Sequence, residues 1–241
     1  MAKIQLHRSK KNQECIDGEY TLYILNKPSD ITYVVPLLWA TTKTYYEEQG
    51  KHRDKWKWAS PDIDYSDVEK LAHDVVNARP TAVAFSVYMW NEKFHIELSQ
   101  RIKQLYPDCI ILWGGPQCDI NNNENYFKEY PHIDVVVPSD AYGEVSFCNI
   151  MDNIADNDGK LDYDSLAYVY YPDENRDRVF NDRGPKKRDF EWPSNPFRAQ
   201  EHHIKPFIEN LHAQGKEVRL MIETSRGCPY KCSFCDWGGG T

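Results

Sequence analysis

Three short apolar runs lie close together in the middle of the chain, at residues 81–88 (TAVAFSVY), 109–113 (CIILW) and 133–137 (IDVVV). Each run is apolar almost throughout instead of alternating with polar residues, which is typical of a strand buried on both faces. Between them lie two stretches, 91–106 and 121–130, that we interpret as helices. The middle of the chain is therefore predicted to hold parallel strands joined by helices.

The same alternation continues on both sides of these runs. Residues 20–26 and 56–58 are rich in strand-forming side chains, whereas 33–49 has helical character. A further helix, begun by Asp64 or Ser66, is expected to run to about residue 78, and Gly143 opens another that runs to about residue 154. Five strand–helix alternations across residues 20–157 predict an α/β fold with a doubly wound parallel sheet.

A sheet of this kind has one edge at which ligands bind. The loops that follow the carboxyl ends of parallel strands gather there, because the crossover connections are right-handed. We expect that edge to hold residues 26–30, 86–91, 114–118 and 138–144.

The composition changes after the predicted sheet. Residues 166–171 (LAYVYY) and 178–180 flank a turn and are predicted to form a hairpin. Residues 181–200, with three prolines and a charge cluster, are interpreted as a linker, and 217–223 (EVRLMIE) as a new strand. The predicted division is an α/β domain over 1–160, a hairpin and linker over 161–215, and the start of a second domain over 216–241.

Composition and charge exclude several classes of protein. The 241 residues are 41% hydrophobic and 27% charged, which is ordinary for a soluble globular protein and argues against disorder. A net charge of −8 disfavours a nucleic-acid partner, which would need a basic face. Because the chain has neither an apolar run long enough to cross a membrane nor a signal peptide, we expect it to be cytoplasmic.

The seven cysteines fall into two groups. Their odd number and the expected reducing compartment disfavour a disulfide framework. Cys109, Cys118 and Cys148 lie in or beside apolar runs, so we expect buried structural thiols. Three of the other four cysteines lie within eight residues of one another near the end of the chain.

That cluster forms the spacing Cys228-x-x-x-Cys232-x-x-Cys235 within residues 224–240 (TSRGCPYKCSFCDWGGG). Three thiolates this close on a loop can converge on one metal centre. A structural zinc site needs four protein ligands, so a distant Cys or His would have to complete the set, and ferredoxins normally supply four cysteines per cluster. Three thiolates on a four-iron cluster leave one iron open to a small molecule, which is a catalytic arrangement.

At this loop the sequence resembles the radical S-adenosylmethionine (SAM) enzymes. Their signature is C-x-x-x-C-x-aromatic-C, with Phe234 as the aromatic residue, and the neighbouring Arg226-Gly227 and Pro229 also fit. The resemblance implies that the three cysteines ligate a [4Fe–4S] cluster. It also implies that SAM chelates the open iron and that Phe234 lies near the adenine.

The resemblance extends upstream to the cobalamin-binding class of these enzymes and covers about residues 20–241. Its landmarks are Ser86, Gly114-Gly115-Pro116, residues 134–137 (DVVV) and residues 142–144 (YGE), in that order. It implies a flavodoxin- or Rossmann-like cobalamin-binding domain, then a linker, then the first strand and cluster loop of a radical SAM β/α barrel. The implied cofactor contacts are Ser86, Gly114, Gly115, Pro116, Gly143 and Glu144, although Glu144 can instead anchor its helix.

The chain departs from the family pattern after its first strand. The D-x-H-x-x-G motif, which supplies a histidine to cobalt in many cobalamin proteins, is replaced there by residues 26–30 (NKPSD). Bound cobalamin is therefore expected to lack a histidine from that motif. His95 is expected to be solvated or to cap its helix, and Trp90 offers a flat surface for a corrin ring. Gly115→Leu is expected to block cobalamin while leaving the fold intact.

The sequence also stops six residues after Cys235. A radical SAM barrel needs more strands, so we expect a fragment of a longer enzyme that does not turn over alone. For the whole enzyme, the resemblance implies reductive cleavage of SAM to methionine and a 5′-deoxyadenosyl radical. Methyl transfer to an unactivated carbon of a small-molecule or natural-product substrate would follow, with flavodoxin or ferredoxin as the reducing partner.

Two alternatives to this function remain open. One is a radical SAM enzyme with non-methylating chemistry. The other is a non-catalytic flavodoxin-like module with a structural zinc loop.

Overall fold

The computed structural model describes residues 19–25, 34–49, 52, 55–59, 67–118, 120–139, 143–183 and 196–199, together with residues 205, 208–209, 212–215, 217, 230 and 232–234.

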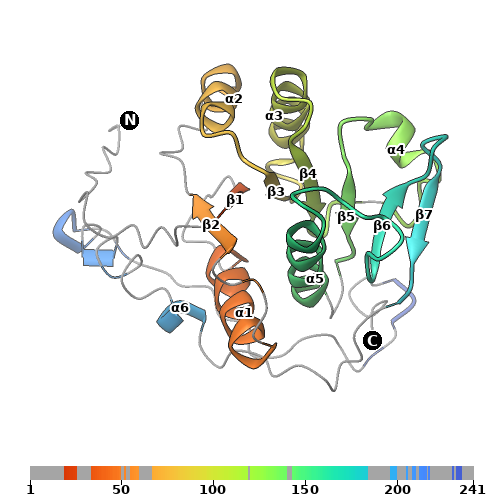
Figure 1. Ribbon diagram of the computed structural model, residues 1–241. Coiled ribbons are helices and arrows are strands. Elements are labelled where there is room, and N and C mark those ends of the chain that lie inside the picture. The colour runs from red at the N-terminus through yellow and green to blue at the C-terminus, as the bar shows by residue number, and fades with distance from the viewer. Residues whose placement is uncertain are drawn as a thin grey trace.

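Five parallel strands form the centre of the molecule (Figure 1). They are β1 (Tyr20–Leu25), β2 (Trp56–Ala59), β3 (Ala82–Ser86), β4 (Ile110–Gly114) and β5 (Val135–Val137). Their order in the sheet is β2-β1-β3-β4-β5, and each neighbouring pair is parallel. The chain changes direction across the sheet between β1 and β3, which is the switch point at which doubly wound sheets bind ligands. The predicted doubly wound parallel sheet is confirmed.

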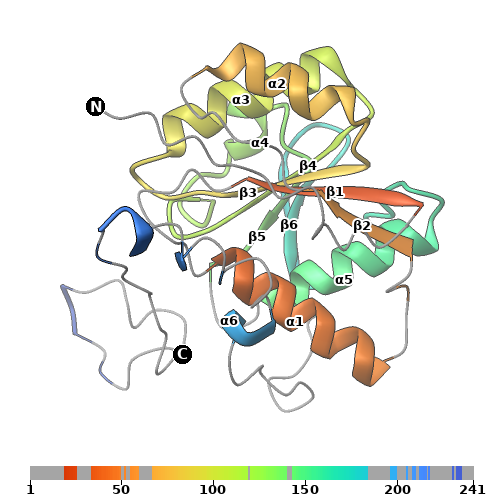
Figure 2. The ribbon, with the colours of Figure 1, turned by 90° about the vertical axis from the view of Figure 1, so that its left-hand side faces the viewer.

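Helices cover both faces of this sheet (Figure 2). One face carries α1 (Val34–Gln49) and α5 (Gly143–Asp156), and the other carries α2 (Val68–Asn77), α3 (Glu92–Leu105) and the short α4 (Tyr126–Glu129). Residues within β1, β3, β4 and β5 alternate between the two cores, and because both cores are apolar these strands read as nearly continuous apolar runs. A further short helix, α6 (Pro196–Ala199), contacts α1.

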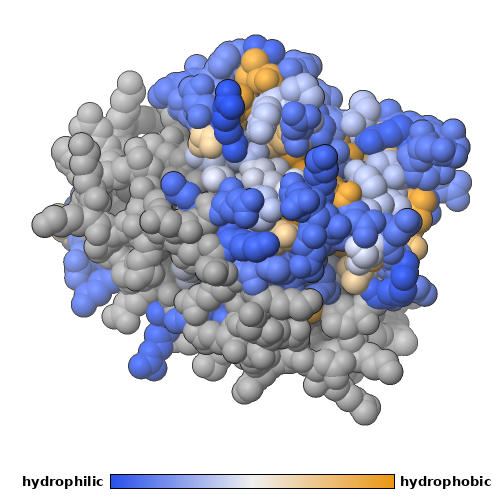
Figure 3. Space-filling view, in the orientation of Figure 1, coloured by the Kyte–Doolittle hydropathy of each residue, from blue (hydrophilic) through white to orange (hydrophobic). Residues whose placement is uncertain are grey.

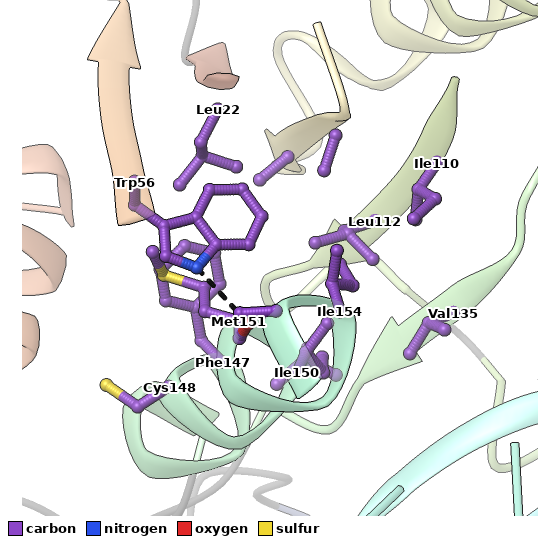
Figure 4. Packing of buried hydrophobic residues seen from close by; sticks show 14 of the residues in the cluster. Leu22, Trp56, Ile110, Leu112, Val135, Phe147, Cys148, Ile150, Met151 and Ile154 are labelled. Atoms are coloured by element: carbon purple, nitrogen blue, oxygen red, sulfur yellow. Dashed lines mark hydrogen bonds between the residues drawn. The ribbon is translucent and has the colours of Figure 1, made fainter. Parts of the chain in front are cut away.

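The core beneath α5 shows how one face is held (Figure 4). Phe147, Ile150, Met151 and Ile154 pack toward the sheet. The buried indole of Trp56 in β2 donates its N–H to the carbonyl of Met151 at 3.2 Å. This bond satisfies the one polar atom of a large apolar ring. The edge strand β2 therefore packs against α5 without leaving the indole nitrogen buried and unpaired.

The predicted hairpin extends the sheet. Strands β6 (Val169–Pro172) and β7 (Arg178–Asn181) are antiparallel, and β6 pairs with β5, which makes seven strands in one sheet. The guanidinium of Arg176 donates to three backbone carbonyls, those of Phe127, Pro131 and Ile133. The hairpin is thus attached to the α/β sheet, although the sequence grouped it with the linker.

Two local predictions need correction. Helix α2 is capped by Asp67, whose side chain accepts from the Lys70 N–H at 3.0 Å, and not by Asp64 or Ser66. Helix α4 spans four residues instead of 121–130, because the side chain of Asn123 accepts from the Asn125 N–H and forms a turn there. The predicted strand 217–223 lies outside the described residues apart from Glu217.

The surface of the described part is mainly polar on the side drawn in Figure 3. Hydrophilic residues dominate over α2, α3 and the hairpin, and hydrophobic ones appear as scattered spots. None of the described helices has the length and apolar character needed to cross a membrane.

The hairpin generates a prediction about the smallest stable unit. A chain shortened to residues 1–160 loses the buried side chains of Leu166 and Val169 and exposes the edge of β5. We expect its free energy of unfolding to lie about 3 kcal/mol or more below that of a chain ending at residue 183. Urea unfolding followed by circular dichroism measures both, and equal values would contradict the inferred contribution of the hairpin.

Candidate functional site

The loops that follow β3 and β4 are joined at the carboxyl edge of the sheet. The Val87 N–H donates to the Gly114 carbonyl at 2.7 Å, and the Gln117 N–H donates to the Val87 carbonyl at 3.3 Å. These two bonds continue the β3–β4 pairing beyond the end of the strands. The two loops therefore form one connected backbone unit beside the switch point.

Gly115 makes this connection possible. Its φ is +116°, a conformation that residues with a side chain rarely adopt. A Cβ atom at this position would lie 2.4 Å from the Val87 carbonyl oxygen and 2.9 Å from the Val87 nitrogen. The expectation that Gly115→Leu leaves the fold intact is therefore wrong, because the first side-chain carbon already collides with backbone.

A cavity of about 180 Å³ opens at the same edge. It lies over the carboxyl ends of β1, β3, β4 and β5, between the first turns of α1 and α5. All six residues that the resemblance implied as cofactor contacts line it: Ser86, Gly114, Gly115, Pro116, Gly143 and Glu144. Residues spread over 59 positions of the sequence thus meet at one place.

The cavity is mainly apolar, and Ser86, Tyr88, Ser139 and Glu144 are among the lining residues that carry polar side-chain atoms. Small-molecule pockets usually measure about 300–1,000 Å³, so this one matches a ring-sized part of a larger ligand. Sequence reasoning missed the contribution of α1, whose Val34, Leu37 and Leu38 also line the cavity. The signal was available, since a helix that follows β1 must begin at the same edge.

An aromatic pair borders the cavity. The ring of Tyr88, which lines it, stacks on the ring of Trp90 with centroids 4.5 Å apart and planes 7° from parallel. Trp90 is 61% exposed and its neighbour Met89 is 76% exposed. The indole is therefore largely exposed beside the cavity, where the sequence had suggested a surface for a corrin ring.

His95 does not have the expected position. It is fully buried on α3, with its ring edge-on to Phe85 and close to Phe94, so it is neither solvated nor a helix cap. Among the described histidines, His52, His73, His95, His132 and His212, none lines the cavity.

The three cysteines expected to be structural are poor metal ligands. Cys109 and Cys148 are fully buried, and Cys118 is partly buried. Burial raises the pKa of the Cys109 and Cys118 thiols to about 12, and it also raises the pKa of Cys148. All three remain protonated near neutral pH, whereas a metal binds the thiolate.

The cluster loop is described only in part. Cys232 is exposed and free, and Phe234 is 91% exposed. Cys228 and Cys235 lie outside the described residues, as do residues 26–30 and Tyr142. Within the described ranges no three metal-binding side chains come together.

Comparison with known proteins supports the family resemblance. The chain matches no protein-family model. It is 27% identical over 212 residues to the cobalamin-dependent radical SAM methyltransferase TokK of Streptomyces tokunonensis. It is 24% identical over 208 residues to a 2-(S-pantetheinyl)-carbapenam-3-carboxylate methyltransferase of Streptantibioticus cattleyicolor. Each match covers 86% of this chain and 29% of the relative, so the chain spans about three tenths of their length. The resemblance to cobalamin-dependent radical SAM enzymes is thereby confirmed.

The two neighbouring glycines should respond differently to the same change. In Gly115→Ala the methyl group collides with Val87, and we expect a loss of about 2 kcal/mol or more in the free energy of unfolding. At Gly114 a Cβ atom would meet its nearest neighbour, the Cβ of Val137, at an ordinary 3.6 Å. Gly114→Ala should therefore change that free energy by less than about 1 kcal/mol. Denaturant unfolding of both variants measures the difference, and equal losses would contradict the described backbone.

Proposed function

We propose that the described α/β domain binds cobalamin at the carboxyl edge of its sheet, as part of a cobalamin-dependent radical SAM methyltransferase. One observation carries the proposal. The residues implied by the resemblance, from three separate segments, line a single apolar cavity at the switch point of the sheet. One relative is named a cobalamin-dependent radical SAM methyltransferase and the other a methyltransferase, which supports this function for the longer enzyme.

The residues at this edge fit a corrinoid with a nucleotide tail. Gly114 carries no side chain, and a Cβ atom there would meet nothing closer than 3.6 Å, so a ligand can approach its backbone closely. The apolar walls suit an aromatic base, and the exposed Trp90 suits the flat ring system. The nucleotide tail would lie in this apolar cavity. Because none of the described lining residues is a histidine, cobalt would have no histidine ligand from this edge.

Titration of the chain with hydroxocobalamin tests this assignment. We expect saturable binding and a base-off absorption spectrum without the signature of a histidine–cobalt bond. No spectral change at high micromolar cobalamin would remove the cofactor assignment.

A matched pair of variants places the ligand in the cavity. Gly114 lies on the same strand face as Leu112, which also lines the cavity, so a larger side chain there fills the cavity without disturbing Val87. Gly114→Leu should weaken cobalamin binding by about tenfold or more, the scale of an overpacked site. Gly114→Ala is the graded comparison: its methyl group fills less of the cavity, so it should weaken binding clearly less than Gly114→Leu does. Equal binding by both variants would place the ligand elsewhere.

The cluster loop supplies the second half of the proposed function. Three clustered thiols are the donor set that iron–sulfur clusters use, and they leave room for a small molecule on one iron. With cluster, SAM and cobalamin bound, the cofactors would supply reductive SAM cleavage and methyl transfer to an unactivated carbon. This chain would contribute Cys228, Cys232 and Cys235 as ligands and Phe234 beside the adenine. A small-molecule or natural-product substrate and a flavodoxin- or ferredoxin-like electron donor complete the proposal.

Iron content should separate the two groups of cysteines. After anaerobic reconstitution, Ala at position 228, 232 or 235 should abolish the cluster, because two protein ligands remain. Cys118→Ala should keep its iron, since that thiol is partly buried and stays protonated. Loss of the cluster in Cys118→Ala but not in Cys228→Ala would contradict the ligand set. One zinc per chain with no acid-labile sulfide would favour the alternative, a flavodoxin-like module with a structural zinc loop.

A further inference from the structure

The loop that presents the aromatic pair is held by one buried side chain. Asn91 is 1% exposed. Its amide oxygen accepts from the Tyr88 N–H at 2.8 Å, and its amide nitrogen donates to the Ser86 carbonyl at 3.1 Å. The side chain therefore connects the end of β3 with the residue that begins the stacked pair.

The Asn91 side chain makes these bonds instead of the hydrogen bond that usually caps the start of a helix. It occupies the N-cap position of α3, where an asparagine oxygen usually accepts from a free N–H in the first turn of the helix. Here the side chain makes no such capping bond. Its hydrogen-bonding capacity is directed back into the loop, so it contributes to loop geometry and not to the start of the helix.

The loop geometry determines what the edge offers a ligand. Tyr88 lies both in the cavity wall and against Trp90, so its backbone position sets where the exposed indole stands. Buried amide hydrogen bonds restrict this position before any ligand arrives. Such preorganisation lowers the entropy that binding must remove.

We propose that Asn91 is a positioning residue for the corrinoid: its amide holds residues 86–90 so that the Tyr88–Trp90 stack stands ready beside the cavity. This inference rests on the proposed function, because it needs cobalamin to bind at this edge. It assigns Asn91 a role in affinity that is transmitted through Trp90 and involves no contact of its own with the ligand.

A matched control separates this role from general stability. Asn153 is 7% exposed and also braces a loop, donating to the Asp162 carbonyl and accepting from the Asp162 N–H, but it does not line the cavity. Asn91→Leu and Asn153→Leu each remove a buried amide brace from the full chain. Hydroxocobalamin affinity, corrected for the folded fraction, should fall by about tenfold in Asn91→Leu and remain nearly unchanged in Asn153→Leu.

A double-mutant cycle tests the route through the indole. If Asn91 acts by placing Trp90, Asn91→Leu should change the affinity by less than about threefold in a Trp90→Ala background. Should Asn91→Leu fail to fold, the same cycle with Asn91→Asp applies, since a carboxylate keeps the acceptor for the Tyr88 N–H. That variant should show a smaller loss, again reduced without Trp90.

The outcomes distinguish the two proposals. Absence of binding by the unchanged chain would overturn the proposed function and this inference together. Binding by the unchanged chain, with equal losses in Asn91→Leu and Asn153→Leu or with fully multiplicative effects of Asn91 and Trp90, would overturn the positioning role alone.

Discussion

The backbone of Val87 occupies the space into which a side chain at Gly115 would project, and the arrangement of the ligand edge depends on this contact. Because Gly115 has no Cβ atom, the Val87 N–H reaches the Gly114 carbonyl, and the loops after β3 and β4 leave the sheet together. Ser86, Tyr88 and Pro116 reach the same cavity for that reason. The sequence Gly114-Gly115-Pro116 is a family landmark that suggests a ligand site. In the structure, the glycine at position 115 is needed for the two loops to pair.

Burial on both faces explains why the sheet was predictable. Strands β3, β4 and β5 have nearly every side chain in one of the two cores, so their sequences are almost entirely apolar. The edge at which loops gather follows from parallel strands with right-handed crossovers, a rule that needs no knowledge of side-chain contacts. This is why residues as distant as Ser86 and Glu144 were predicted to lie at one edge.

Other features depend on contacts that a single sequence does not encode locally. The segment before α2 offers several residues that could cap the helix, and the structure shows that Asp67 does so. His95 is polar in composition, yet Phe85 and Phe94 enclose it, and their approach depends on how α3 packs on the sheet. The hairpin was recognisable from its turn, but its place beside β5 depends on long-range bonds of Arg176.

The proposed site would have to hold cobalamin without a coordinate bond from a histidine. None of the described histidines lines the cavity. Retention would then depend on burial of the tail against apolar walls and on contact with a flat aromatic face, which are individually weak and sensitive to distance. Weak contacts give useful affinity only when their geometry is established in advance. The backbone hydrogen bonds of Val87 hold the residue before Tyr88, and the Asn91 amide bonds the Tyr88 N–H and the Ser86 carbonyl. Together these bonds restrict the position of Tyr88, where the cavity borders the exposed indole.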